Sequence, residues 1–169
     1  MPSKENLISD CWVIGYGNSH RGDDGIGPYV ANRVEQALKH RKGVQTRALY
    51  QLDPALIEEL QDAATLIFVD ASMEIIDNGW KWTRIEPDFR GFYHVTHLFG
   101  PCFLLGLIHS LYQRYPDTWL VTVQGDKFDF KESLTPGAGN RACQAVSEIL
   151  NFLDIHQTQT ICNPMIEAR

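Results

Sequence analysis

The chain has 169 residues, a net charge of -6 and 44% hydrophobic residues. This length suits one domain with a sizeable core, and the composition excludes collagen-like and disordered chains. An acidic chain repels polyphosphate, so we expect neither nucleic acid nor an anionic membrane as its main partner.

No apolar run reaches the roughly 20 residues that a membrane-spanning helix needs. The polar start MPSKENLISD leads only into the short apolar run Trp12–Ile14, whereas a signal peptide needs a longer one. We therefore expect a cytoplasmic protein. Its four cysteines contain no C-x-x-C pair, which argues against a zinc cluster and favours free thiols: Cys11, Cys102, Cys143 and Cys162.

The first half of the chain predicts two strands and two helices. The apolar run Cys11–Gly17 is short and ends at glycines, as a buried strand does. Apolar residues then recur at helical spacing and indicate a helix over about residues 24–40. Val44–Tyr50 alternates like a second strand, and Asp53-Pro54 is typical of the cap of a short helix over 55–61.

The second half begins with Thr65–Val69, an unbroken apolar run typical of a central strand buried on both faces. Asn78-Gly79 is a turn signal before Trp80–Ile85, which alternates like a strand with one exposed face. The remaining predicted elements are a helix over 96–115, a strand at Thr118–Val123, a polar loop over 125–140 and a helix over 142–153.

Strands that alternate with helices predict an α/β fold. We expect a three-layer sandwich, in which a mainly parallel, mixed sheet of about five strands lies between helices. The chain shows no internal repeat or linker, so residues 1–169 are expected to form a single domain with its core at about 11–153. In such folds, ligands bind beyond the carboxyl ends of the strands.

Polar side chains follow the predicted strands at these ends. Asp23 and Asp24 come after the first strand, Asp70 follows the third directly, and His97 stands at the start of the long apolar helix. Two carboxylates and an imidazole at one edge would suit a divalent transition metal with open coordination positions. The sequence therefore predicts a cation-binding edge.

Each of these residues also has a structural interpretation. An aspartate at a strand end often fixes a turn or caps the next helix, which applies to Asp70. Asp23 and Asp24 are suitable N-cap residues, and we expect Asp23 to serve the helix start while Asp24 faces the metal. His97 alone could be a structural hydrogen bonder. Only the combination of strand-end positions favours a functional site.

The glycine-rich turn after the first strand does not match a phosphate loop. A dinucleotide fingerprint needs a third glycine where His20 stands, and no G-K-[ST] occurs. Two adjacent carboxylates would also repel a pyrophosphate. A serine hydrolase is not supported around Ser19, and Cys102, placed after His97, is expected in the core rather than as a protease nucleophile.

Four motifs, in order, resemble the hydrogenase maturation proteases, which trim the C-terminus of the large subunit of nickel-iron hydrogenases. Gly17–Gly27 is similar to their G-N-x-x-x-x-D-[DE]-x-x-G signature, and Leu66–Ala71 to their second acidic strand end. His97–Gly100 resembles an H-x-x-G helix start, and Ser133–Pro136 the L-[ST]-P segment before the last helix. The resemblance covers about residues 11–153.

The resemblance implies a twisted mixed sheet, a monomer and an endopeptidase that acts on the large-subunit precursor. It assigns Asp24, Asp70 and His97 to the nickel of that substrate, with no permanent cofactor in the protease itself. Another divalent metal could take the place of nickel. The attacking water could be activated by Asp24, by Asp70 or by the metal, and the sequence leaves these routes open. A nickel checkpoint or chaperone without hydrolysis is the alternative.

The chain also departs from the family pattern. Position 24 holds Asp where some relatives have Glu, which shortens the side chain by one methylene. The aromatic insert Asn78–His94 is expected either in the core or at a substrate-docking surface. The Gly22–Pro28 segment and the Gly125–Phe130 loop suggest a bidirectional hydrogenase as the enzyme served.

Overall fold

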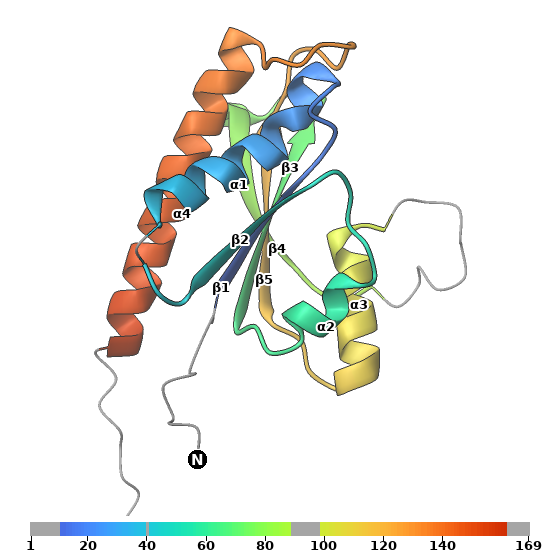
Figure 1. Cartoon of the computed structure of the whole chain (residues 1–169), viewed down its shortest axis with the longest axis vertical. Coiled ribbons are helices and arrows are strands. Elements are labelled where there is room, and N and C mark those ends of the chain that lie inside the picture. Colours follow the sequence, from blue (N-terminus) through green and yellow to red (C-terminus); the bar gives the residue numbers. More distant parts are fainter. Residues whose placement is uncertain (1–10, 40, 89–98, 162–169) are drawn as a thin grey trace, which may run out of the picture.

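The computed structural model describes residues 11–39, 41–88 and 99–161, with only the backbone from residue 155 onward. Within these residues the chain forms a five-stranded sheet in the order β2-β1-β3-β5-β4. The first four strands in this order are parallel, and β4 is antiparallel to β5 (Figure 1). The strands are β1 (Cys11–Tyr16), β2 (Val44–Leu49), β3 (Thr65–Ser72), β4 (Trp80–Ile85) and β5 (Asp117–Gln124).

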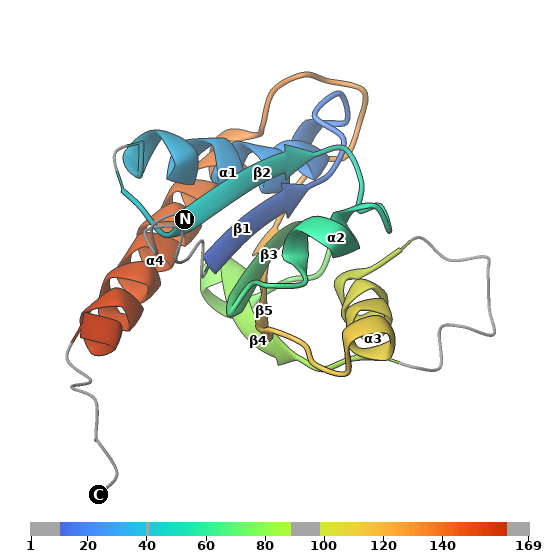
Figure 2. The same ribbon diagram turned by 60° about the horizontal axis from the view of Figure 1, so that its bottom comes forward.

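Helices cover both faces of the sheet, as Figure 2 shows. One face carries α1 and α4, and the other carries α2 and α3 (Figures 1 and 2). Their bounds are α1 (Ile26–Ala37), α2 (Leu56–Leu60), α3 (Pro101–Tyr112) and α4 (Pro136–Ile161). The predicted α/β sandwich with a mainly parallel mixed sheet is therefore confirmed, while the single-domain organisation over 1–169 stays a prediction.

Strand β3 shows why its apolar run is unbroken. Ile67 and Val69 pack into the core on the α1 and α4 side, whereas Leu66 and Phe68 pack into the core on the α2 and α3 side. All four side chains are fully buried. A central parallel strand is covered on both faces, so neither alternating position can be polar.

Helix α4 is longer than the sequence pattern indicated. We predicted a polar loop to residue 140, but the helix begins at Pro136. The Thr135 hydroxyl accepts a hydrogen bond from the Ala138 backbone N–H at 3.3 Å, and proline suits the first helical position. The Thr-Pro pair was thus the start signal, and it outweighs the glycines that follow it.

Part of the aromatic insert belongs to the core. The Trp80 and Trp82 side chains pack into the core on the face of the sheet that carries α1 and α4. There the ring centroids of Trp82 and Phe152 are 5.0 Å apart. A docking role for these two tryptophans is therefore not supported. Residues 89–94 of the insert lie outside the described residues. No helix among the described residues is long and apolar enough to cross a membrane.

The first turn of α1 lies against the backbones of β1 and β3. A Cβ atom at Gly27 would stand 2.3 Å from the Tyr16 carbonyl oxygen and 2.6 Å from that of Val69. A Cβ atom at Gly15 would stand 1.8 Å from the Gly27 carbonyl oxygen. Only glycine permits this approach, because a side chain at either position would overlap backbone atoms that cannot move independently.

We expect Gly27→Ala to lower the free energy of unfolding by at least about 2 kcal/mol, because the new methyl group overlaps two strand carbonyls. Gly139→Ala is the matched control: its Cβ would meet nothing within 4 Å, and we expect no loss and a gain of up to about 1 kcal/mol. Urea unfolding followed by circular dichroism measures both. Equal effects of the two substitutions would contradict this account of the α1 packing.

Candidate active site

Asp70 lies near the carboxyl end of β3, beside the end of β1. The Tyr16 hydroxyl, from the last residue of β1, donates a hydrogen bond to Asp70 Oδ2 at 2.8 Å. The Asp70 side chain is only partly exposed. The third strand thus places a carboxylate at the predicted edge of the sheet, and a neighbouring strand holds it there.

Asp24 reaches the same edge from the connection between β1 and α1. It belongs to the short 3-10 turn Gly22–Gly25, and the Asn18 backbone N–H donates a hydrogen bond to its Oδ2 at 2.9 Å. Its charge makes a minor contribution to the raised pKa of Asp70, which is caused mainly by burial. The charges of Asp24 and Asp70 therefore interact across the ends of β1 and β3, while the assignment of both residues to one site stays a prediction.

Asp70 has an unusual protonation equilibrium. Burial, supported by the charge of Asp24, raises the pKa of Asp70 to about 6, although hydrogen bonds from Tyr16 and from the Ala71 backbone act in the opposite direction. A carboxyl group with a pKa near neutrality can accept a proton and return it at cellular pH. Such groups occur more often in active sites than elsewhere.

Asp23 has a different role from the one that we predicted. It does not cap α1, which has no side-chain hydrogen bond at its N-cap. Its fully buried carboxylate instead accepts hydrogen bonds at 2.7–2.9 Å from the backbone N–H groups of Asp126, Lys127 and Thr135 and from the Thr135 hydroxyl. Asp23 thus ties the loop after β5 to the connection after β1.

The hydrogen bonds also decide the charge of Asp23. Burial alone would raise the pKa of Asp23, but the donors from Thr135, Lys127 and Asp126 together lower it below its ordinary value. The carboxylate stays ionised and fully occupied by this chain. It is therefore a structural anion, whereas a ligand-binding role of Asp24 and Asp70 stays a prediction.

The third predicted residue, His97, lies outside the described residues. Helix α3 begins shortly after it at Pro101, and the Cys102 thiol in its first turn is close enough to Tyr16 to affect the pKa of that phenol. Within residues 11–39, 41–88 and 99–161, no three His, Cys, Asp or Glu side chains gather to hold a metal ion. The assignment of Asp24, Asp70 and His97 to a metal stays a prediction.

Two alternatives become weaker. Burial and the nearby charge of Asp88 raise the pKa of the Cys102 thiol, which disfavours the thiolate that a cysteine protease needs. The glycines of the turn serve backbone packing: Gly17 has φ of 144°, and a Cβ atom there would lie 2.0 Å from the Asp24 carbonyl oxygen. Their spacing is therefore explained without a phosphate.

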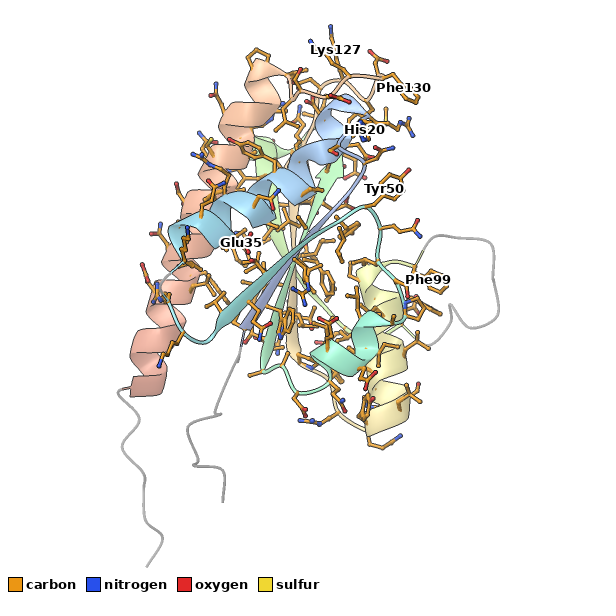
Figure 3. The ribbon with its side chains drawn as sticks, in the orientation of Figure 1. His20, Glu35, Tyr50, Phe99, Lys127 and Phe130 are labelled. Carbon is orange, nitrogen blue, oxygen red and sulfur yellow. The ribbon has the colours of Figure 1, made fainter. Side chains whose placement is uncertain are left out.

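A groove of about 580 Å³ lies beside the 3-10 turn, between α1 and the segment that leads into α4. Its lining includes Ser19, Tyr29, Asn32, Ser133 and Pro136, but neither Asp24 nor Asp70. The groove is thus a neighbour of the carboxylate pair. Figure 3 shows His20, Lys127 and Phe130 at this same end of the molecule.

Tyr16 was missed by sequence reasoning. Its partner Asp70 is 54 positions away along the chain, so no local pattern connects them. The Thr135 contact to Asp23 spans 112 positions, although the Ser133–Pro136 segment was already noticed for its resemblance. Both contacts follow from the sheet order, which places distant segments side by side.

We expect Asp70→Asn to stabilise the protein above pH 6. The Asp70 carboxyl has a pKa of about 6 when folded and 3.8 ordinarily, so the folded state binds more protons between these values and loses stability as the pH rises through 6. Asparagine cannot ionise and avoids this loss. The expected gain in unfolding free energy is about 1 to 2 kcal/mol at pH 8.

Thermal unfolding of both proteins between pH 4 and pH 8 tests this expectation. The gain should shrink toward zero as the pH approaches 4, where Asp70 is protonated in the folded wild type. A substitution that destabilises at pH 8 would show instead that the Asp70 carboxylate is part of the structural framework.

Asp23→Asn should have the opposite effect. The amide group would face backbone donors, so we expect a loss of about 2 to 4 kcal/mol at pH 7. Asp129→Asn, at an exposed position of the same loop, is the control and should change little. Urea unfolding at pH 7 measures both, and similar small losses in the two variants would refute the structural role of Asp23.

Comparison with known proteins supports the fold. No family model and no curated protein matches the sequence. The solved structures that match include the [NiFe] hydrogenase maturation protease HycI from Thermococcus kodakarensis, with a TM-score of 0.67 and 21% identity over 88% of this chain and 95% of that one. The hydrogenase maturating endopeptidase HybD from E. coli gives a TM-score of 0.64 and 20% identity, over 86% and 93% of the two chains.

A third match is the hydrogenase 2 maturation peptidase from Thaumarchaeota archaeon SCGC_AB-539-E09. It has a TM-score of 0.63 and 22% identity over 85% of this chain and 97% of that one. The matches to these three structures extend over 93–97% of their chains. The chain therefore has the fold of the hydrogenase maturation proteases.

Proposed function

We propose that the protein is an endopeptidase that removes the C-terminal extension of a nickel-loaded [NiFe] hydrogenase large-subunit precursor. The observation that carries this proposal is the Asp24 and Asp70 pair at the carboxyl edge of the sheet, in the fold of the maturation proteases. The four sequence motifs support it further. Asp24, Asp70 and His97 would face the nickel, which belongs to the substrate.

Exposed apolar side chains near this edge favour a protein substrate. Met73 and Ile75, shortly after β3, are 79% and 91% exposed, and Phe130, in the loop after β5, is 92% exposed. Strands β3 and β5 are parallel neighbours, so both loops lie at the same end of the sheet. Apolar groups exposed together commonly mark a surface for another macromolecule.

Asp70 suits the proton transfers of peptide hydrolysis. As a carboxylate it would accept a proton from the attacking water, and as an acid it would return the proton to the leaving amine. Its pKa of about 6 supports both forms near neutral pH. Asp24 or the nickel of the substrate could activate the water instead, and these routes stay open.

Weak ligands would let the protease inspect the nickel without removing it. Carboxylate and imidazole groups compete poorly with the precursor's thiolates, which are softer ligands for the metal. Cleavage would then depend on the presence of nickel in the precursor. We propose that the protein has no permanent cofactor, is a monomer and is located in the cytoplasm. That its substrate belongs to a bidirectional hydrogenase stays a prediction.

A non-hydrolytic nickel checkpoint is the second candidate. Both candidates use the same three residues, Asp24, Asp70 and His97, toward a nickel ion that the partner holds. A checkpoint protein would bind the precursor stably without changing its mass. Mass spectrometry of the precursor therefore separates the two functions.

We expect the purified protein to shorten the nickel-loaded precursor and to leave the nickel-free precursor intact. Asp24→Asn, Asp70→Asn and His97→Ala should each reduce the cleavage rate by about 100-fold or more, because each removes a group assigned to the reacting centre. Asp129→Asn is the control and should cleave normally. Full cleavage by the triple variant would show that the site is assigned wrongly.

A further inference from the structure

The hydroxyl group of Tyr16 has a specific partner. A phenol has one proton to donate, and Tyr16 donates it to Asp70 Oδ2 at 2.8 Å. The Tyr16 ring packs edge-on against Phe68, with the ring centroids 6.5 Å apart. Phenylalanine at position 16 would keep this packing and remove the hydrogen bond to Asp70.

The segment that contains Tyr16 holds both carboxylates of the pair. Tyr16 contacts Asp70 through its side chain, and Asn18 contacts Asp24 through its backbone N–H at 2.9 Å. Between them, Gly17 allows the 3-10 turn to approach, because a Cβ atom at this position would lie 2.0 Å from the Asp24 carbonyl oxygen. The end of β1 therefore sets the position of the two acids relative to each other.

The contact also makes the two oxygens of Asp70 unequal. One lone pair of Oδ2 accepts the Tyr16 proton, and the carboxylate, which also has a hydrogen bond from the Ala71 backbone, cannot rotate without losing the Tyr16 bond. A charge-assisted hydrogen bond of this kind is stronger than a neutral one. A group that bound at Oδ1 would leave the Tyr16 bond in place.

We propose that Tyr16 is a positioning residue, whose hydroxyl holds the Asp70 carboxylate in one orientation and makes Oδ1 the oxygen that meets the substrate. This inference rests on the proposed function in so far as Asp70 acts on a peptide substrate. Its structural half, the hold of Tyr16 on Asp70, is independent of the reaction. Positioning of this kind affects the rate more than substrate binding.

Tyr16→Phe tests the proposal, with Tyr115→Phe as the matched control. The Tyr115 hydroxyl also donates to a carboxylate, Glu86 Oε2, at 2.7 Å, but it lies just before β5 starts, at the other end of the sheet. We expect Tyr16→Phe to lower kcat for precursor cleavage about 10-fold, with KM within twofold of wild type. Tyr115→Phe should leave both constants unchanged.

A crystal structure of each variant without substrate supplies the second measurement. In the Tyr16→Phe variant we expect the Asp70 carboxylate in more than one orientation, whereas wild type and Tyr115→Phe show one. An unchanged single orientation, or an unchanged kcat, would overturn the proposal. If wild type does not cleave the precursor, the proposed function fails, and the Asp70 orientation still decides whether Tyr16 holds that side chain.

Discussion

The close contact between α1 and the strands β1 and β3 is the constraint on which the rest of the structure depends. Gly15 and Gly27 let the helix backbone touch the strand backbones, with no side chain between them. The 3-10 turn that precedes α1 is thereby held over the ends of these strands. The turn carries both Asp23 and Asp24, so the position of each carboxylate follows from backbone packing.

The two adjacent aspartates of this turn have opposite roles. Asp23 is fully buried, and its oxygens are occupied by donors from the loop after β5. Asp24 is only partly buried, and its charge adds a minor contribution to the raised pKa of Asp70, which burial mainly causes. The hydrogen bonds to Asp23 stabilise the fold, while the burial of Asp70 opposes the ionisation of its carboxyl and costs stability at neutral pH.

Much of the fold was predictable because its signals are local. Apolar runs, helical spacing and turn residues depend on neighbours within one or two turns of chain, and they indicated all five strands. The predicted start of α4 was too late. The glycines at 137 and 139 favoured a loop in the prediction, whereas in the structure the cap at Thr135 starts the helix before them. Asp70 was located correctly at a strand end, but its tyrosine partner was not foreseen.

The sequence by itself determined the order of strands and helices and the placement of carboxylates at the strand ends, since both are written in short stretches of residues. Only the tertiary structure decided which aspartate is structural and which belongs to the pair. The donors to Asp23 lie more than 100 positions away in the chain, and Tyr16 meets Asp70 across neighbouring strands. Hydrogen bonds and charges act through space, so their partners are settled by the order of strands in the sheet.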